Sequence, residues 1–310
     1  CHEQPRNFGL HLWASLGNKL ADELSSARLV LPWLMGIIGA PVWMVGLLVP
    51  IREAGALLPQ IFVAGFIRLK PKRKWVWVAG ALIQAVAALA LATLALISTG
   101  TLGGGLVLAA LIILSLARGL SSIATKDVLG KTIAKRRRGT LMGWSGSVAG
   151  GATLVAGAIL MLLERQPGNL VVAALLAIAA ISWLLNALAA ARIKETPGAV
   201  EGGENGWDSI KLGMSLLKHD RTFLHFNVAR ALLLSSALAL PYLALLGQNQ
   251  SGTHLGGLGI LIVVSGIAAM VASPVWGKRA DQSSRRVMRD AAIGTIVCCL
   301  IGASLAWLPG

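Results

Sequence analysis

Charged and polar side chains recur along one side of the first apolar segment of the chain. With about 100° between successive residues of an α-helix, Asn18, Lys19 and Asp22 fall within one arc, and Glu23 lies at its edge. A charge that faces lipid at mid-membrane costs about 3 kcal/mol or more. The stripe is therefore expected to face protein or a watery cavity, where it either stabilises packing or exchanges a proton at Asp22 or Glu23. Lys19 is spaced to pair with either carboxylate.

The second apolar segment contains two adjacent charged residues. Arg52 and Glu53 stand near its middle, between Pro50 and Pro59. Neighbouring residues of a helix point about 100° apart, so at least one of the two faces the interior. Arg52 is a candidate either for attracting an anionic substrate group or for keeping Asp22 ionised. The prolines loosen the helix, which suits a segment that bends.

Two later apolar segments each contain one arginine. Arg118 stands in the fourth segment, and Arg230 stands in the seventh, one helical turn after Asn227. An arginine within a membrane either serves a function or forms a structural ion pair. The candidates for a substrate cavity or for coupling are Asn18, Lys19, Asp22, Glu23, Arg52, Glu53, Arg118, Asn227 and Arg230.

No spacing of residues in the sequence points to catalysis. The sequence has no Gly-rich phosphate loop and no Gly-x-Ser-x-Gly motif, and its five His and three Cys do not stand at metal-binding spacings. We therefore expect no catalytic residue, no metal, no cofactor and no enzymatic activity. The alternative is a membrane enzyme that acts on lipid-linked substrates. Such an enzyme needs its reactive groups at the membrane interface, whereas the densest polar groups here stand at mid-depth.

The composition predicts an all-α, polytopic membrane protein. Hydrophobic residues make up 55% of the 310 residues and charged residues only 13%, about half the charged share of soluble domains. A helix crosses the hydrocarbon layer with about 20 apolar residues, and lipid leaves no partner for a free backbone group. Spans are expected at about 10–36, 42–66, 75–98, 104–124, 140–163, 169–191, 222–246, 254–276 and 290–308.

The net charge of +15 is concentrated in every second loop. Basic residues gather after the second, fourth, sixth and eighth spans, whereas the segments 99–103 and 247–253 contain no charge. Because cytoplasmic loops retain Lys and Arg, the amino terminus and the basic loops are predicted to be cytoplasmic. The charge forms no single patch, so the expected partner is the lipid bilayer and not a nucleic acid.

A long connector divides the chain into two halves. Residues 195–205 are rich in Gly, Pro and Glu, which is typical of a flexible linker. Ile210, Met214 and Leu217 then share one helical face, which predicts a short amphipathic helix on the inner membrane surface. The predicted organisation is a six-helix bundle over 1–192, a cytoplasmic linker over 193–221, and the first three helices of a second bundle over 222–310.

Two basic loops stand at equivalent positions of the halves and are similar to each other. One runs from Gly65 to Lys74, with Leu69 at its centre, and the other runs from Gly277 to Arg286. Both resemble the loop motif of the major facilitator superfamily, Gly-x-Leu-Ala-Asp-Arg-x-Gly-Arg-Lys, which is taken to steady one conformation of the gating cycle. Leu69 cannot form the bond that the Asp of the motif makes. The matching candidates are Gly65, Arg73, Lys74, Gly277, Asp281, Arg285 and Arg286.

The resemblance implies a secondary transporter of a small solute. In that family two six-helix bundles enclose a cavity that opens alternately to each side, so the implied partners are a small-molecule substrate and a coupling proton. Members have twelve spans, and the nine predicted here are interpreted as a fragment with an incomplete second bundle. The expected location is the bacterial inner membrane. A transporter-like fold that acts only as a sensor or scaffold is the second alternative.

Overall fold

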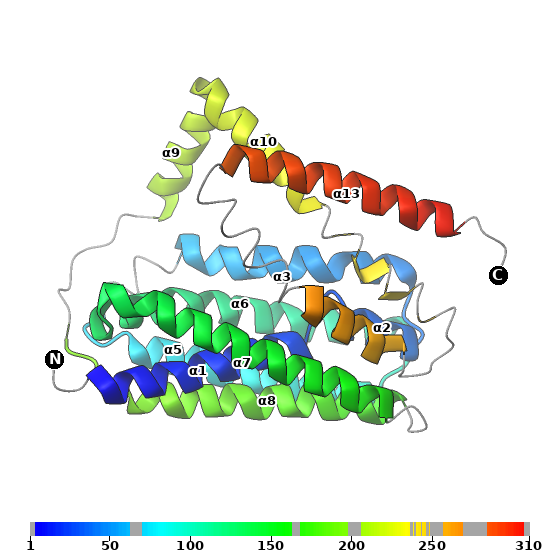
Figure 1. Cartoon of the computed structure of the whole chain (residues 1–310), viewed down its shortest axis with the longest axis horizontal. Helices are drawn as coiled ribbons and strands as arrows, with labels where there is room; N and C mark the ends of the chain where they lie inside the picture. The colour runs from blue at the N-terminus through cyan, green and yellow to red at the C-terminus, as the bar shows by residue number, and fades with distance from the viewer. Residues whose placement is uncertain are drawn as a thin grey trace.

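A computed structural model of the chain describes residues 4–62, 70–162, 168–197, 206–235, 238, 240–242, 244–245, 248, 257–268 and 284–306 (Figure 1). In these residues the regular structure is helical. The helices are α1 (Gln4–Leu24), α2 (Val30–Ile37), α3 (Val42–Phe62), α5 (Lys74–Ile97), α6 (Gly100–Thr132), α7 (Lys135–Leu162), α8 (Gly168–Arg192), α9 (Gly206–His219), α10 (Arg221–Ser235) and α13 (Ser284–Ala306). A shorter apolar helix spans Gly257–Ala268.

The first predicted span consists of two helices. α1 ends at Leu24 and α2 begins at Val30. At the break, the hydroxyl of Ser25 donates to the carbonyl of Ala21 at 2.7 Å, and the amide of Leu31 donates to the carbonyl of Ser26 at 2.9 Å. Pro32 in the first turn of α2 has no N–H to donate to the carbonyl of Arg28, which disfavours a continuous helix through this segment. The expectation of one continuous helix over 10–36 was therefore wrong at this point.

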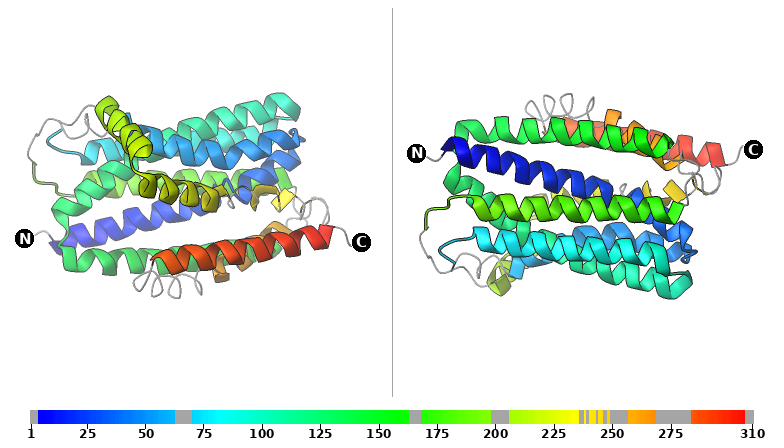
Figure 2. Two further views of the ribbon diagram at one scale, coloured as in Figure 1. Left: turned by 90° about the horizontal axis from the view of Figure 1, so that it is seen from above. Right: turned by 90° about the horizontal axis from the view of Figure 1, so that it is seen from below.

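The long helices of the first part of the chain pack side by side along the long dimension of the molecule (Figures 1 and 2). These are α1, α3, α5, α6, α7 and α8. α5 contacts α6 and α8, α3 contacts α6, and α1 contacts α7 and α8. Small residues line these interfaces. A Cβ on Gly17 would lie 2.7 Å from the carbonyl oxygen of Ser182, and a Cβ on Gly119 would lie 2.6 Å from that of Ala56. Glycine thus lets α1 approach α8 closely and α6 approach α3 closely.

The bundle is apolar both inside and outside. Trp33, Trp77 and Trp183 are buried, whereas the large apolar side chains of Ile97 and Leu102 on the outer surface are more than three-quarters exposed. α3, α5, α6 and α8 are each long and apolar enough to cross a membrane. A continuous apolar exterior on long helices is suited to lipid and not to water. The predicted all-α, polytopic fold class is confirmed.

α6 is longer than its predicted span of 104–124, since it continues to Thr132. α7 begins almost at once, at Lys135. Lys126 and Lys131 therefore stand on the final turns of a helix rather than in a loop. Charged residues end the part of a helix that lipid accommodates, but Lys is a good helix former and does not end the helix itself.

The later part of the chain contacts the first part through α9, which contacts α3, and through residues at the end of the bundle opposite the N-terminus (Figure 1). The Tyr242 hydroxyl lies against Gly46 of α3, and the Gln248 amide lies against Gly36 of α2. Gln248 also donates to the carbonyl of Trp33 at 3.2 Å. α9, α10 and α13 lie on the outer side of α3 in the view of Figure 1, and α10 contacts both α9 and α13.

Candidate functional site

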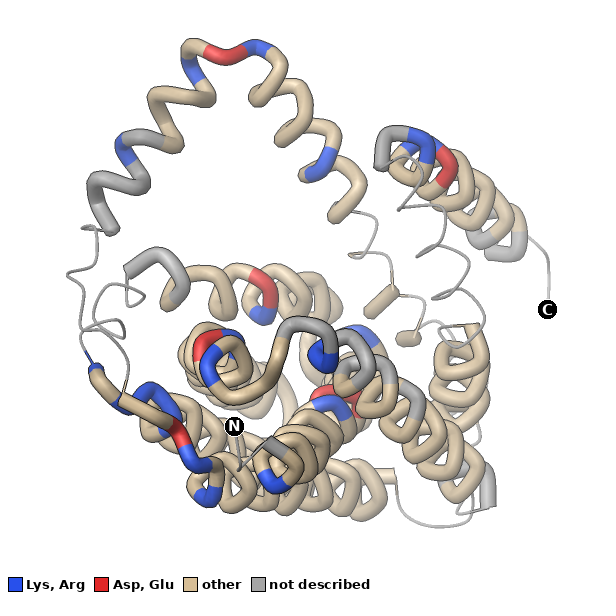
Figure 3. Tube along the Cα trace, turned by 60° about the vertical axis from the view of Figure 1, so that its left-hand side comes forward, with Lys and Arg blue, Asp and Glu red and all other residues tan. Residues whose placement is uncertain are grey.

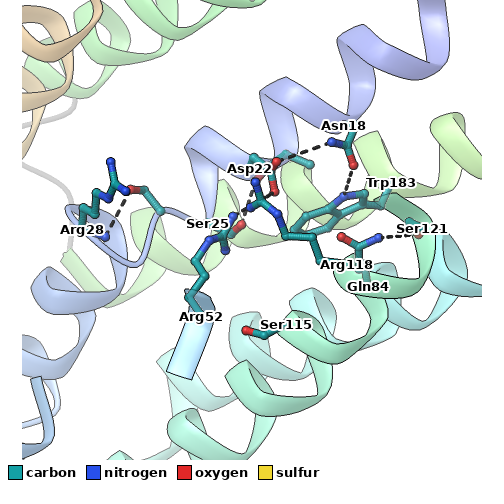
Figure 4. Close-up of polar contacts among 12 residues, drawn as sticks. Asn18, Asp22, Ser25, Arg28, Arg52, Gln84, Ser115, Arg118, Ser121 and Trp183 are labelled. Carbon is teal, nitrogen blue, oxygen red and sulfur yellow. Dashed lines mark hydrogen bonds and ion pairs between the residues drawn. The ribbon is translucent and has the colours of Figure 1, made fainter. Parts of the chain in front are cut away.

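Asp22 of α1 lies between two arginines from other helices (Figure 4). Its Oδ1 accepts hydrogen bonds from Arg52 of α3 and from Arg118 of α6, each at 2.9 Å. The exposed fraction is 16% for the side chain of Asp22, 10% for that of Arg52 and 36% for that of Arg118. Charge-assisted bonds of this kind are short and strong, and loss of one partner leaves a buried charge uncompensated. Three helices thus meet on one carboxylate oxygen.

Asn18 connects this cluster to α8. Its amide nitrogen donates to Oδ2 of Asp22 at 3.4 Å, and its amide oxygen accepts from Nε1 of Trp183 at 3.2 Å. The amide of Asn186 approaches the same oxygen at 3.5 Å. The close approach of α1 to α8 at Gly17 makes these contacts possible. Asn18 therefore fixes the orientation of the Asp22 carboxylate.

The remaining charged candidates of the first half surround this cluster. The Nζ of Lys19 points toward α7, where a Cβ on Gly146 would lie 3.1 Å from it. Glu23 is close enough to Arg52 to interact with it electrostatically. Glu53 instead pairs with Arg28 at 3.4 Å, and both of those side chains are about half exposed. Of the adjacent Arg52 and Glu53, the arginine is the one that points inward.

A second charged cluster lies at the end of the bundle near the N-terminus (Figure 3). The carboxylate of Glu195, just after α8, accepts from the backbone amides of Arg73 at 3.1 Å and Lys74 at 2.8 Å, and from the Nζ of Lys131 at 3.0 Å. Its side chain is 0% exposed. A carboxylate at this place satisfies amides that the first turn of α5 leaves free. Glu195 thus joins the end of α8 to α5 and α6.

The two basic residues of the first loop motif both belong to this second cluster. The guanidinium of Arg73 pairs with Asp127 of α6 at 2.9 Å. The Nζ of Lys74 donates to the carbonyls of Ala191 and Ile193 at 2.9 and 2.8 Å. A cation at the carboxyl end of α8 satisfies carbonyls that the helix itself leaves free. The motif therefore holds three helix ends together.

Comparison with known families agrees with this arrangement. The model of the Major Facilitator Superfamily matches residues 23–310. The chain belongs to the major facilitator superfamily. It is therefore a membrane transporter of small solutes, and this family indicates transport rather than catalysis. Among curated proteins, no relative matches the chain.

Several predicted residues of this major facilitator transporter lie away from the cluster around Asp22. Asn227 donates to the carbonyl of Phe223 within its own helix at 2.8 Å, and Arg230 is exposed on α10. Arg286 is exposed on α13. The candidates outside the described residues are Gly65, Gly277 and Asp281, together with the side chain of Arg285. Within the described part of the chain, no group of His, Cys, Asp or Glu is arranged to hold a metal ion.

Sequence reasoning missed two acidic residues that the transporter uses at the end of its bundle. Asp127 is the one acidic residue of the basic segment 126–138, and Glu195 follows Arg192 and Lys194. An isolated acid among basic residues is a signal for an ion pair, and that signal was present in both places. Glu195 was instead assigned to the flexible linker because Gly and Pro follow it.

Proposed function

We propose that this transporter works by alternating access and couples solute movement to protons through Asp22. The proposal rests on the position of the Asp22 carboxylate, which is mostly buried in the bundle and shared by Arg52 and Arg118. Ionisable groups at such depth are costly and are concentrated along substrate and proton pathways. A carboxyl group that exchanges a proton there makes the transport cycle depend on the proton gradient.

Protonation of Asp22 would change the contacts among three helices. The ionised carboxylate attracts Arg52 of α3 and Arg118 of α6 toward α1. A protonated carboxyl group loses that charge, so it no longer offsets the repulsion between the two guanidinium groups. The helices then favour a different packing, and alternating access requires two such arrangements.

The other candidates take supporting roles in this proposal. Asn18 positions Asp22, and Lys19 and Glu23 line the cavity beside it. The cluster around Glu195 steadies the end of the bundle that we assign to the cytoplasm. This assignment follows from the basic residues there, and it gives the chain a cytoplasmic N-terminus. The location that we propose is a bacterial inner membrane.

Replacement of Asp22 tests the coupling. The full-length protein is reconstituted in vesicles and supplied with labelled sugars, organic anions and organic cations. We expect Asp22→Asn to abolish uptake driven by a pH gradient but to leave counterflow of the same solute intact, because only the coupled step needs a titratable group. Glu53→Gln is the matched control, since Glu53 forms an exposed pair with Arg28.

The results separate coupling from transport. Survival of pH-driven uptake in Asp22→Asn would eliminate the coupling role of that residue. Absence of counterflow for every solute in the unaltered protein would instead indicate a sensor or scaffold, because a scaffold moves no solute.

A further inference from the structure

Two positive groups meet on one carboxylate oxygen in the cluster around Asp22. The guanidinium groups of Arg52 and Arg118 both donate to Oδ1 of Asp22 at 2.9 Å. The two guanidinium groups are also close enough to repel each other. Inside a helical bundle this repulsion is screened less than it is in water. A further oxyanion beside the two guanidinium groups would therefore be attracted by both.

The donors of the two arginines are also incompletely used. Both guanidinium groups donate to the same atom, Oδ1 of Asp22. Each guanidinium has five N–H donors. Among the described residues, Nη1 of Arg52 is buried and has no hydrogen-bond partner. Its side chain is nine-tenths buried, with an exposed fraction of 10%. A buried cationic donor without an acceptor is unfavourable, so an arrangement in which an oxygen atom reaches it would be stabilised.

We propose that Arg52 and Arg118 form the binding site for an anionic solute, held through the oxygen atoms of a carboxylate or phosphate group. The inference rests on the proposed function, in which this cluster lines the solute cavity. Guanidinium groups bind carboxylate and phosphate through pairs of parallel hydrogen bonds, which a neutral or cationic solute cannot accept in the same way. Arg118, whose side chain is 36% exposed, is reached first, and the more deeply buried Arg52 follows.

Asp22 has a second role in this scheme as an internal competitor. Its carboxylate occupies the arginines when no solute is bound. A solute with one negative charge binds most favourably when Asp22 accepts a proton, because the charge of the cluster then stays unchanged. Anion binding and protonation at this site are thereby linked. The scheme predicts that removal of the Asp22 charge strengthens anion binding, whereas removal of either arginine weakens it.

The test measures thermal unfolding of the full-length protein in lipid nanodiscs with matched probes. The aromatic anions are benzoate and phenyl phosphate, and their counterparts with the same ring are neutral benzamide and cationic benzylamine. The aliphatic anions are acetate, citrate and glycerol 3-phosphate, and their neutral counterparts are acetamide and glycerol. A ligand that binds the folded state raises the unfolding temperature as its concentration increases. We expect anions, and not their neutral or cationic counterparts, to stabilise the protein. Comparison of the carboxylates with the phosphates identifies which oxyanion is preferred.

Variants locate the effect. Arg118→Gln should weaken binding of the stabilising anion by about 30-fold or more, which corresponds to the loss of one charge-assisted partner. Asp22→Asn should strengthen it. Arg28→Gln is the matched control, because it removes a neighbouring guanidinium that is about half exposed and paired with Glu53. If Arg118→Gln does not fold, the rise in unfolding temperature that anions cause in the unaltered protein and in Asp22→Asn still decides whether an anion binds at this cluster.

Three results would overturn the anion site: no probe anion stabilises the protein, neutral analogues stabilise it equally, or Arg28→Gln weakens binding as much as Arg118→Gln. Counterflow distinguishes this failure from failure of the transport function. Exchange of a neutral solute would preserve transport and eliminate the anion site. Anion binding without any counterflow would preserve the site and eliminate transport.

Discussion

Removal of the Glu195 carboxylate should destabilise the transporter more than removal of any exposed carboxylate. The Glu195 side chain is 0% exposed, and it accepts from the amides of Arg73 and Lys74 and from the Nζ of Lys131 at 2.8 to 3.1 Å. Glu195→Ala leaves two partly buried backbone amides at the start of α5 and one lysine without this acceptor. Glu195→Gln preserves the volume but places an NH₂ donor against other donors.

The expected magnitude follows from these three contacts. A hydrogen bond to a charged group contributes about 1.5–3 kcal/mol, and loss of one partner from a buried ion pair costs about 3–5 kcal/mol. The three contacts share one carboxylate, so their separate contributions do not add. We expect Glu195→Ala to cost about 4 kcal/mol and Glu195→Gln about 2 kcal/mol of unfolding free energy. The first value corresponds to a decrease of about 10 °C in unfolding temperature.

Thermal unfolding in nanodiscs, followed by tryptophan fluorescence, measures this difference. Glu53→Gln is the control, because its pair with Arg28 is 3.4 Å long and about half exposed, and such pairs contribute about 1 kcal/mol or less. The reasoning is refuted if Glu195→Ala unfolds at the same temperature as Glu53→Gln. That result would mean that the contacts of Glu195 do not hold α5, α6 and α8 together.

Two further predictions concern packing and topology. Gly119→Ala should destabilise the protein by about 1–3 kcal/mol, because the new Cβ would lie 2.6 Å from the carbonyl oxygen of Ala56. A Cβ on Gly105 of the same helix would have no atom within 4 Å, so Gly105→Ala should be neutral or stabilising by up to about 1 kcal/mol. Equal unfolding temperatures of the two variants would contradict this packing. Single cysteines are introduced at Lys72 and Arg137 in a background without the native cysteines. Both should react with a membrane-impermeant maleimide only when the reagent has access to the cytoplasmic face of the membrane. Labelling from opposite faces would overturn the predicted topology.

The membrane-embedded helices could be predicted because lipid imposes a simple requirement. A backbone in hydrocarbon must satisfy its own hydrogen bonds, so each long apolar segment becomes a helix. The same rule does not locate helix ends. α6 continues through Lys126 and Lys131 to Thr132, because a helix that leaves the membrane is free to carry charge. The break between α1 and α2 cannot be predicted from the length of the apolar segment, because it depends on local backbone chemistry such as that of Pro32.

The candidate site was predictable residue by residue but not as a cluster. Asp22, Arg52 and Arg118 each stood out because a charge within an apolar segment is costly. Helical spacing suggested Lys19 as a partner of Asp22, and Arg52 was a candidate for keeping Asp22 ionised. The carboxylate accepts from Arg52, 30 positions away, and also from Arg118, 96 positions away, which was not expected as its partner. No local pattern specifies such distant partners.

The sequence by itself determined that the chain is a bundle of membrane-spanning helices with charges inside its apolar segments, because composition and segment length act locally on each helix. Only the tertiary structure decided which charges meet. The close approach at Gly17 brings α1 to α8, and that at Gly119 brings α6 to α3, so that the long arginine side chains of α3 and α6 reach the Asp22 carboxylate on α1. The same is true of Glu195, whose partners are supplied by helix ends that come together only on folding.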